Sequence, residues 1–245
     1  MSEDTLVLCY HAVPTSDWPD TTAVTAKRFA TQMAILARRG YRGVTFSEAV
    51  SGPPSGRRVA VTFDDGFHSV LDHALPVLER HGWPGTMFVV TDYGDGGRLI
   101  DWPSLDRWVG TRYEPELRAL SWEELGQLKA RGWEIGSHTC SHPRLPKIEP
   151  ERMRHELAES RRVCIERLGS CESIAYPYGD LNAAVVEAAG VAGYRTAAAL
   201  PKPLRPPGRE LEWPRVGVYH GDWLGRFMLK ALPLSRRVRT RAGAG

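Results

Sequence analysis

The chain has 245 residues, of which 42% are hydrophobic and 25% are charged, and its formal net charge at pH 7 is +3. This balance is typical of one globular domain, excludes a disordered or fibrous chain, and gives nucleic-acid binding no support from bulk charge. Four cysteines without a Cys-x-x-Cys pair argue against a disulfide framework or a thiolate zinc site. Because no secretory signal pattern and no bilayer-spanning apolar run occurs, we expect a cytoplasmic protein.

In the N-terminal half, short apolar runs alternate with helical patterns. Buried strands are predicted at residues 6–10, 44–46, 59–63 and 86–91, and helices around residues 29–37 and 70–81. A Gly- and Pro-rich link is expected over residues 51–58. Asp64 and Asp65 therefore stand at the C-terminal end of a predicted strand.

The alternation continues after a long loop. Residues 93–118 have no periodic pattern and predict a loop or lid, whose Trp102 and Trp108 either stack on a bound ring or fill the core beneath it. A capping box at Ser121 and Glu124 starts a helix that ends near Gly132. Further strands are predicted at residues 133–135, 173–176, 196–200 and 213–219, and further helices at 150–168 and 183–189.

This order of elements predicts a single-domain parallel α/β barrel, complete or incomplete. We expect the domain over residues 1–222 and a basic C-terminal tail over residues 223–245. In such a barrel the functional residues lie at the C-terminal ends of the strands. Residues that follow predicted strands are therefore the first candidates for a site.

Two pairs of polar residues occupy such positions. Asp64 and Asp65 precede Gly66, although an Asp-Gly pair is also common in ordinary turns. His138 and His142 lie four positions apart after another strand, a spacing that suits two ligands of one metal ion. Either pair alone is compatible with a structural role. Together, two imidazoles and one carboxylate would hold a metal and leave positions open for water and substrate.

Residues 62–66 (TFDDG), 138–142 (HTCSH) and 176–179 (YPYG) resemble, in order and separation, three motifs of one family. This is the polysaccharide deacetylase family, carbohydrate esterase family four, also called the NodB-homology domain. The resemblance covers roughly residues 5–220 and implies a distorted (β/α) barrel that hydrolyses the N-acetyl group of an acetamido sugar. It makes Asp64 the general base and Tyr178 a backbone N–H donor to the oxyanion. The metal ligands that it implies are Asp65, His138 and His142.

The implied reaction has clear chemical needs. Amide hydrolysis requires an activated water, stabilisation of the tetrahedral oxyanion and an acid for the departing amine. A divalent metal meets the first two needs, and zinc is the first expectation, although the ligand set also suits iron, cobalt, nickel or manganese. Cys140 lies between the two histidines and is expected to be structural, since no second cysteine is near in the sequence.

Two positions depart from the family pattern. Where many members have an arginine that tunes the base, this chain has Ala175, so Arg215 is either its replacement or a surface residue. The catalytic acid is also ambiguous. His220 loosely resembles the C-terminal Leu-x-His element, whereas His11, in Tyr10-His11, resembles the element of circularly permuted members and is our preferred acid.

The C-terminal tail is basic and partly apolar. After Asp222 the sequence has six cations and no acidic residue: Arg226, Lys230, Arg236, Arg237, Arg239 and Arg241. Together with interleaved leucines they predict either a final barrel helix with a basic end or a segment that makes weak peripheral contact with anionic membranes. Pro233 is expected to end this helix ahead of the arginine cluster.

The leading hypothesis is a metal-dependent sugar N-deacetylase whose partner is an acetamido-sugar substrate. The substrate class stays open among a polysaccharide, an oligosaccharide, a glycolipid and a sugar-containing biosynthetic intermediate. One alternative is a metal-dependent amidohydrolase that acts on a non-sugar amide, formamide or imide. Another is a degenerate barrel that binds glycans without catalysis, against which the presence of Asp64 argues, because a binding protein needs no base.

Overall fold

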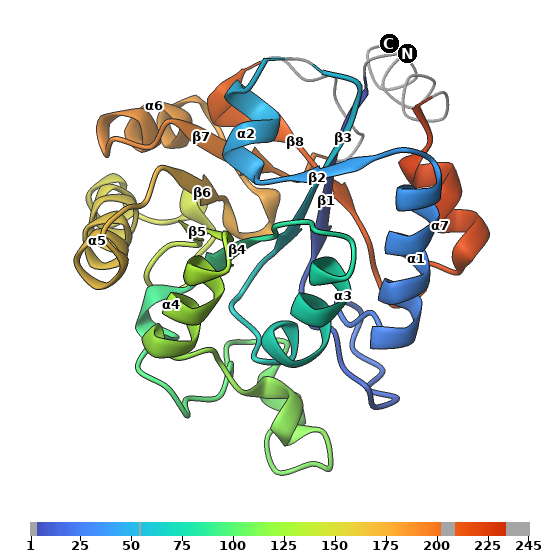
Figure 1. Cartoon of the computed structure of the whole chain (residues 1–245). Coiled ribbons are helices and arrows are strands. Elements are labelled where there is room, and N and C mark those ends of the chain that lie inside the picture. The colour runs from blue at the N-terminus through green and yellow to red at the C-terminus, as the bar shows by residue number, and fades with distance from the viewer. Residues whose placement is uncertain (1–3, 54, 202–208, 234–245) are drawn as a thin grey trace.

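Parallel strands build the centre of the molecule, which a computed structural model describes over residues 4–53, 55–201 and 209–233 (Figure 1). In these ranges the strands are β1 Asp4–Tyr10, β2 Arg42–Val44, β3 Arg57–Phe63, β4 Thr86–Val89, β5 Glu134–Ser137, β6 Ser173–Ala175, β7 Thr196–Ala199, β8 Trp213–Pro214 and β9 Val216–Gly217. The α-helices are α1 Ala26–Arg38, α2 Phe46–Ser51, α3 Leu75–Glu79, α4 Trp122–Ala130, α5 Pro150–Leu168, α6 Ala183–Val191 and α7 Leu224–Ala231. A π-helix, η1 Val70–Ala74, leads into α3, and short 3₁₀ turns are η2 Thr91–Tyr93, η3 Asp106–Trp108, η4 Glu114–Leu117, η5 Leu145–Lys147, η6 Pro177–Gly179 and η7 Glu210–Glu212.

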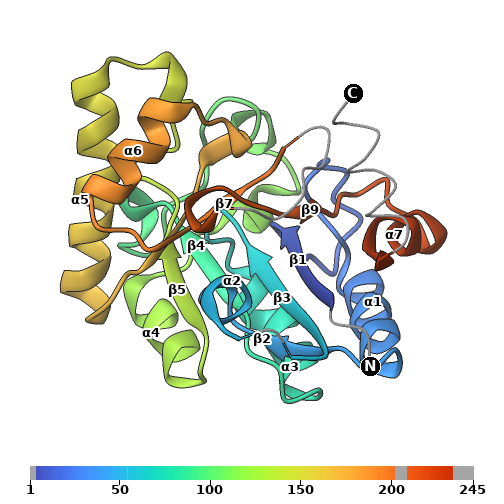
Figure 2. The same ribbon diagram turned by 90° about the horizontal axis from the view of Figure 1, so that it is seen from above.

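The strands curl into a barrel that is closed except at one seam. Their order is β8-β7-β6-β5-β4-β3-β1-β9, every pairing is parallel, and β2 adds to β3. Helices surround the strands, as the view from above shows (Figure 2). The predicted incomplete α/β barrel is confirmed.

The seam lies between two consecutive short strands. β8 pairs with β7 at one end of the strand order, β9 pairs with β1 at the other end, and Arg215 is the residue between them. The strand expected over residues 213–219 is therefore split in two. This placement brings the Arg215 side chain into the barrel.

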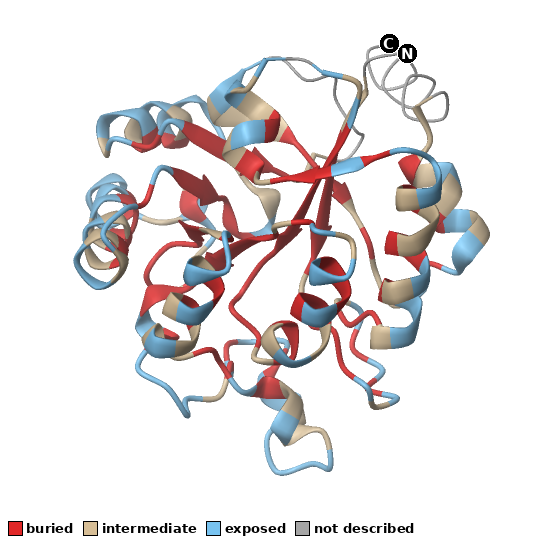
Figure 3. Ribbon diagram, viewed as in Figure 1, coloured by how far each residue is buried: buried red, intermediate tan, exposed pale blue. Residues whose placement is uncertain are grey.

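Alternation along β1 shows how the core is divided. Leu6, Leu8 and Tyr10 belong to the large cluster between the strands and the outer helices, where they meet residues such as Phe29 of α1. Val7 belongs to a small cluster inside the barrel with residues such as Phe88. The strands are thus buried on both faces, while the helices bury one face each (Figure 3). Every second side chain of β1 and of β3 therefore points into the barrel, where the two sets can contact each other.

The long loop over residues 93–118 is irregular, as expected, apart from the turns η3 and η4. It covers a separate apolar cluster that includes Trp18, Phe67 and Trp102. Asp20 holds the loop in place, because its Oδ2 accepts hydrogen bonds from Arg107 Nη2 (2.9 Å) and Trp108 Nε1 (3.0 Å). The loop is therefore a fixed wall beside the C-terminal ends of the strands.

Two expected elements differ from the structure. Phe46, expected to end a strand, instead begins α2, because Thr45 and Glu48 form a capping box at this point. The helix expected over residues 70–81 is divided into η1 and α3, and Pro76, which lacks an N–H, lies in the first turn of α3. α2 lies at the N-terminal ends of the strands, where its Phe46 fills the barrel interior.

The apolar side of α7 packs into the main cluster through Phe227 and Ala231, so the boundary expected at residue 222 falls inside the packed body. Arg226 and Lys230 both form ion pairs with Asp222, which is 2% exposed. The four arginines of the expected membrane segment that follow Pro233 lie outside the described residues. Among the described helices, none is long and apolar enough to cross a bilayer.

Candidate active site

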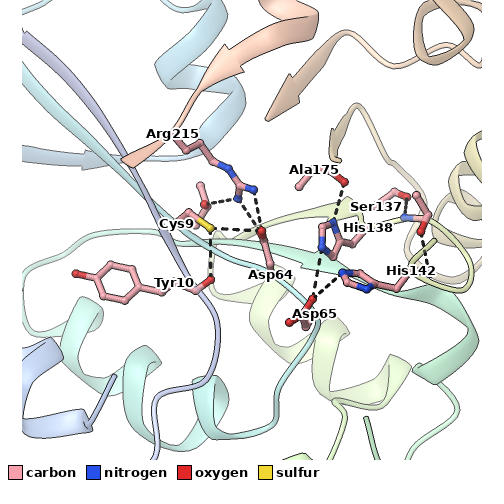
Figure 4. Close-up of polar contacts among 11 residues, drawn as sticks. Cys9, Tyr10, Asp64, Asp65, Ser137, His138, His142, Ala175 and Arg215 are labelled. Atoms are coloured by element: carbon pink, nitrogen blue, oxygen red, sulfur yellow. Dashed lines mark hydrogen bonds and ion pairs between the residues drawn. The ribbon is translucent and has the colours of Figure 1, made fainter. Parts of the chain in front are cut away.

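Three candidate metal-ligand side chains from two strand ends converge on one point. Asp65 follows β3, and His138 and His142 follow β5. Nε2 of each histidine lies 3.4 Å from Oδ1 of Asp65, and ligand atoms of all three residues lie within 4.8 Å of one another (Figure 4). All three residues are buried. The structure thus brings together the complete ligand set expected from the sequence.

The polar atoms of this trio fit a divalent cation. Oδ1 of Asp65 is buried and has no hydrogen-bond partner among the described residues, which is unfavourable unless a cation compensates it. Nδ1 of His138 lies 2.7 Å from the carbonyl oxygen of Ala175. A proton on Nδ1 is donated to that carbonyl, so the lone pair of Nε2 faces Asp65. Two nitrogens and one carboxylate oxygen in this arrangement suit zinc and several other divalent metals.

Burial and neighbouring charges set the protonation of these ligands. Burial lowers the pKa of His142 to about 3, so this imidazole is neutral, as a metal ligand must be. For His138, burial lowers the pKa, but the carboxylates of Asp64 and Asp65 outweigh it and raise the pKa. Burial raises the pKa of Asp65, but the nearby imidazoles, with His138 first, outweigh it and lower the pKa.

Strained backbone accompanies the ligands. Asp65, Thr139 and His142 have φ angles of 75°, 70° and 61°, in the left-handed region that non-glycine residues seldom adopt. Such residues are retained where surrounding contacts hold them. The strain turns the chain sharply at each strand end, so that adjacent residues can face different parts of the site.

Asp64 forms a bidentate ion pair inside the barrel. Nη1 of Arg215 donates to Oδ1 of Asp64 at 2.6 Å, and Nη2 donates to Oδ2 at 2.7 Å, across 151 residues of sequence. Arg215 is 1% exposed, so the alternative of a surface arginine is excluded. Burial raises the pKa of Asp64, but Arg215 outweighs it and holds the pKa well below its usual range. Asp64 is therefore ionised at neutral pH.

A second cluster of ligand-type residues adjoins the first, and it consists of Cys9, His11 and Asp64. The Cys9 thiol lies 3.4 Å from Oδ2 of Asp64 and donates to it, and burial raises the pKa of Cys9 well above its usual value. The Arg215 guanidinium already neutralises Asp64. A protonated thiol and a resident cation make this cluster a poor metal site, so the trio of Asp65, His138 and His142 is the better candidate.

The two candidate acids occupy different places. His11 lines the cavity together with Asp64 and Asp65. His220 is absent from the residues that line this cavity, and its backbone instead bonds to Thr21 and Arg28. Only His11, of these two histidines, is placed to reach a substrate near the metal ligands.

A cavity of about 130 Å³ opens above the ligands. The Trp102 ring stacks on His142 with a centroid distance of 4.3 Å, and the Tyr178 ring packs on His142 at 4.6 Å. Trp102 thus packs in the cluster beneath the loop, which is one of its two expected roles, and it also forms part of the cavity wall. The wall is completed by residues that include Asp20, Thr22, Leu105, Arg107 and Leu200.

The 176–179 segment places Tyr178 at the cavity edge. Tyr178 has φ 61° and is 41% exposed, and the Arg144 guanidinium lies 4.0 Å from its ring centroid. Gly179 also has positive φ, and a Cβ there would lie 2.9 Å from the backbone nitrogen of Leu200. Glycine is therefore required for this turn to pack against the end of β7.

Several site residues were not expected from the sequence. Cys9 beside the base, and Asp20 and Arg107 at the wall, belong to no motif. The inward position of Cys9 follows from the alternation of β1, which was a usable signal. Asp20 and Arg107 depend on the fold of two loops, for which the sequence contains no periodic signal. Cys140 is buried, and burial raises its pKa to about 12, so it fits the structural role expected for it.

Comparisons with known proteins agree with these features. The Bacillus subtilis protein YxkH is 26% identical over 195 residues, which are 77% of this chain and 62% of that protein. The chitooligosaccharide deacetylase of Rhizobium leguminosarum bv. trifolii is 30% identical over 65% of this chain and 63% of its own length. The chain thus spans less than two thirds of these curated relatives.

Solved structures show the same fold. The structure of IcaB from Ammonifex degensii has a TM-score of 0.70 and 26% identity, and the match covers 98% of both chains. The Streptococcus pyogenes deacetylase PplD has a TM-score of 0.74 at 20% identity and covers 94% of this chain and 98% of its own. The polysaccharide deacetylase sequence family matches residues 51–197, which contain the Asp pair, the His pair and the 176–179 segment. The chain belongs to the polysaccharide deacetylase family.

Proposed function

We propose that the protein is a metal-dependent hydrolase that removes the acetyl group from the nitrogen of an acetamido sugar. One observation carries this proposal. Asp65, His138 and His142 surround an unsatisfied carboxylate oxygen, and the adjacent Asp64 is a buried, ionised carboxylate that faces the same cavity. The relatives named as chitooligosaccharide deacetylase and poly-β-1,6-N-acetylglucosamine N-deacetylase support the choice of substrate class.

Asp65, His138 and His142 would hold the metal. A divalent cation in such a site supplies an acidified water and polarises the amide carbonyl. Zinc is our first choice because it accepts two imidazoles and one carboxylate in tetrahedral geometry, but the same donors accept iron, cobalt, nickel and manganese. Measurement of the metal content and of reactivation by each ion identifies the native metal.

Asp64 acts as the base. It takes a proton from the attacking water as the new C–O bond forms at the carbonyl carbon. Arg215 keeps Asp64 ionised and fixes both of its oxygens, so the carboxylate points in one direction. The backbone N–H of Tyr178 donates to the oxyanion.

His11 acts as the acid in the second half of the reaction. It protonates the nitrogen of the sugar as the C–N bond breaks, and the products are acetate and a free amine. Its position in the cavity wall, on the same side as Asp64, supports this role. Asp64 thus accepts a proton when water attacks the carbonyl, and His11 donates a proton when the sugar amine leaves.

The test uses the purified chain with each divalent metal and acetylated chito-oligomers or β-1,6-linked oligomers. Acetate and free amine should appear in equal amounts, and Asp64→Asn should lower the rate by roughly 100-fold or more while metal binding persists. Undiminished activity in Asp64→Asn would refute the mechanism. Release of acid from formamides or cyclic imides, with none from acetamido sugars, would identify the alternative amidohydrolase.

We also propose weak contact with anionic membranes through the C-terminal tail. The apolar side of α7 packs inward and its described cations pair with Asp222, so the contact would depend on the arginines after Pro233. Each cation near an anionic surface contributes about 1 kcal/mol. Sedimentation with anionic vesicles at low salt should show binding that disappears at high salt, with neutral vesicles, or after deletion of residues 234–245. Negligible binding at low salt would refute it.

A further inference from the structure

One buried carboxylate outside the metal trio contacts the ligand loop directly. Glu156 lies on the inner side of α5 and is 4% exposed. Its Oε2 accepts the backbone N–H of Cys140 at 2.9 Å and that of Ser141 at 3.0 Å. Its Oε1 accepts the hydroxyl of Ser141. All three donors lie between the two histidine ligands.

These bonds hold a loop that has no regular structure of its own. Thr139 and His142 have positive φ, at 70° and 61°. A conformation of this kind costs about 1–2 kcal/mol per residue, so it persists only where several contacts determine it. Glu156 provides two of those contacts to consecutive backbone groups.

The remaining backbone N–H groups of the loop have other partners. His138 N donates to Val89 O, Thr139 N to Ser137 Oγ, and His142 N to Thr139 Oγ1. Each of these partners belongs to the loop or to a strand beside it. Glu156 is therefore the residue through which the two central N–H groups of the loop, those of Cys140 and Ser141, are attached to the outer helix layer.

We propose that Glu156 is a positioning residue that sets the metal affinity of the site. It fixes the path of the chain from His138 to His142, and so keeps the second imidazole aimed at Asp65. The proposal rests on the metal site of the proposed function. It extends that function to a residue that contacts neither the ligand side chains nor the cavity.

Loss of the carboxylate leaves the N–H groups of Cys140 and Ser141 without an acceptor, so the loop relaxes and His142 turns away from the shared point. Residues that orient metal ligands typically change metal affinity by 10–100-fold when replaced. Glu156→Ala should therefore raise the zinc dissociation constant by about that factor. Glu156→Gln keeps a carbonyl oxygen for the two N–H groups and should recover most of the affinity.

The experiment measures zinc affinity by competition with a chromophoric chelator, and the ligand geometry from the visible spectrum of the cobalt-loaded protein. The variants are wild type, Glu156→Ala, Glu156→Gln, Met153→Ala and Glu159→Ala. Met153 is a buried residue of the same helix and controls for lost stability, and Glu159 is a partly exposed acid of that helix that controls for charge. Thermal unfolding is recorded for each.

The proposal predicts weaker zinc binding and an altered cobalt spectrum in Glu156→Ala, recovery in Glu156→Gln, and wild-type affinity in both controls. Equal affinity in a folded Glu156→Ala would overturn it, as would an equal loss in a Met153→Ala variant of the same stability. If wild type itself binds no zinc or cobalt, then the metal site of the proposed function fails instead. The two failures are thus distinguishable.

Discussion

The two ends of the barrel differ in how completely their buried polar groups are hydrogen-bonded. At the N-terminal ends of the strands, the Arg58 guanidinium donates to four backbone carbonyls of the α2 segment and to the Thr5 hydroxyl. Glu134 accepts hydrogen bonds from the backbone and hydroxyl of Ser47 and from the hydroxyl of Ser173. These contacts attach α2 to the barrel and close this end.

At the C-terminal ends, several buried polar atoms have no partner among the described residues, including Oδ1 of Asp65 and Nδ1 of both His11 and His142. Every described non-glycine residue with positive φ lies in or beside the cavity there: Asp65, Ser104, Thr139, His142 and Tyr178. The N-terminal end is thus held by a dense set of hydrogen bonds, although Nε of Arg58 has no partner among the described residues. The C-terminal end instead gathers several unsatisfied atoms and the strained residues, which a bound cation could relieve.

The largest effect should follow a change at the C-terminal end. His138→Ala removes one of three ligands and should lower the deacetylation rate by about 1,000-fold, which corresponds to about 4 kcal/mol. Added zinc should raise the unfolding temperature of wild type but not of this variant, because only wild type binds the ion in its folded state. An unchanged zinc response in His138→Ala would contradict the assigned ligand set.

A change at the opposite end should act on stability alone. Arg58→Met leaves four carbonyls without their donor and should lower the free energy of unfolding by about 3 kcal/mol. Denaturant unfolding measures this loss. The rate constant per folded molecule should equal that of wild type, and a lower one would show that the two ends are coupled.

His11→Ala is the converse case. Its Nδ1 has no hydrogen-bond partner in the described structure, so the free energy of unfolding should stay within about 0.5 kcal/mol of wild type. Loss of the acid should reduce turnover by about 100-fold, equivalent to about 2.7 kcal/mol. His220→Ala is the matched comparison, and an essential His220 with a dispensable His11 would reverse the assignment.

The smallest effect is expected for Ser47→Ala. This change removes a hydroxyl that donates to Glu134 at 2.6 Å but keeps the backbone bond from residue 47 to the same carboxylate. Unfolding should become easier by about 1 kcal/mol, without a change in rate. A fall in activity larger than the fall in stability would show that the N-terminal end also shapes the site.

The fold was largely predictable because the strands and helices have strong local patterns. α5, for example, was expected over the residues that it occupies, 150–168. The convergence of Asp65, His138 and His142 was predictable for a related reason, since Asp65 and His138 lie within two residues of a strand end and His142 lies four positions after His138. Spacing indicated the Asp pair and the His pair, whereas the separate roles of Asp64 and Asp65 were implied by the family resemblance.

Long-range contacts account for what the sequence left open. Whether Arg215 was a surface residue or a partner of Asp64 depended on which strands its neighbours in the sequence joined. β8 and β9 are too short for the sequence to predict which strands they pair with. The choice between His11 and His220 depended likewise on which chain segment faces the cavity. Glu156 reaches the ligand loop from a helix whose own pattern predicts only a buried side.

The seam at Arg215 has a consequence for how the chain becomes active during synthesis. Asp64 leaves the ribosome long before residue 215, and the two are separated by 151 positions. Until β8 and β9 dock, the barrel would enclose a carboxylate without its counter-ion, which is strongly unfavourable. A nascent chain that ends before residue 213 therefore has all three candidate metal ligands but lacks the partner of Asp64. Docking of β8 and β9 supplies the counter-ion of Asp64, so a chain that ends before residue 213 should lack the proposed activity.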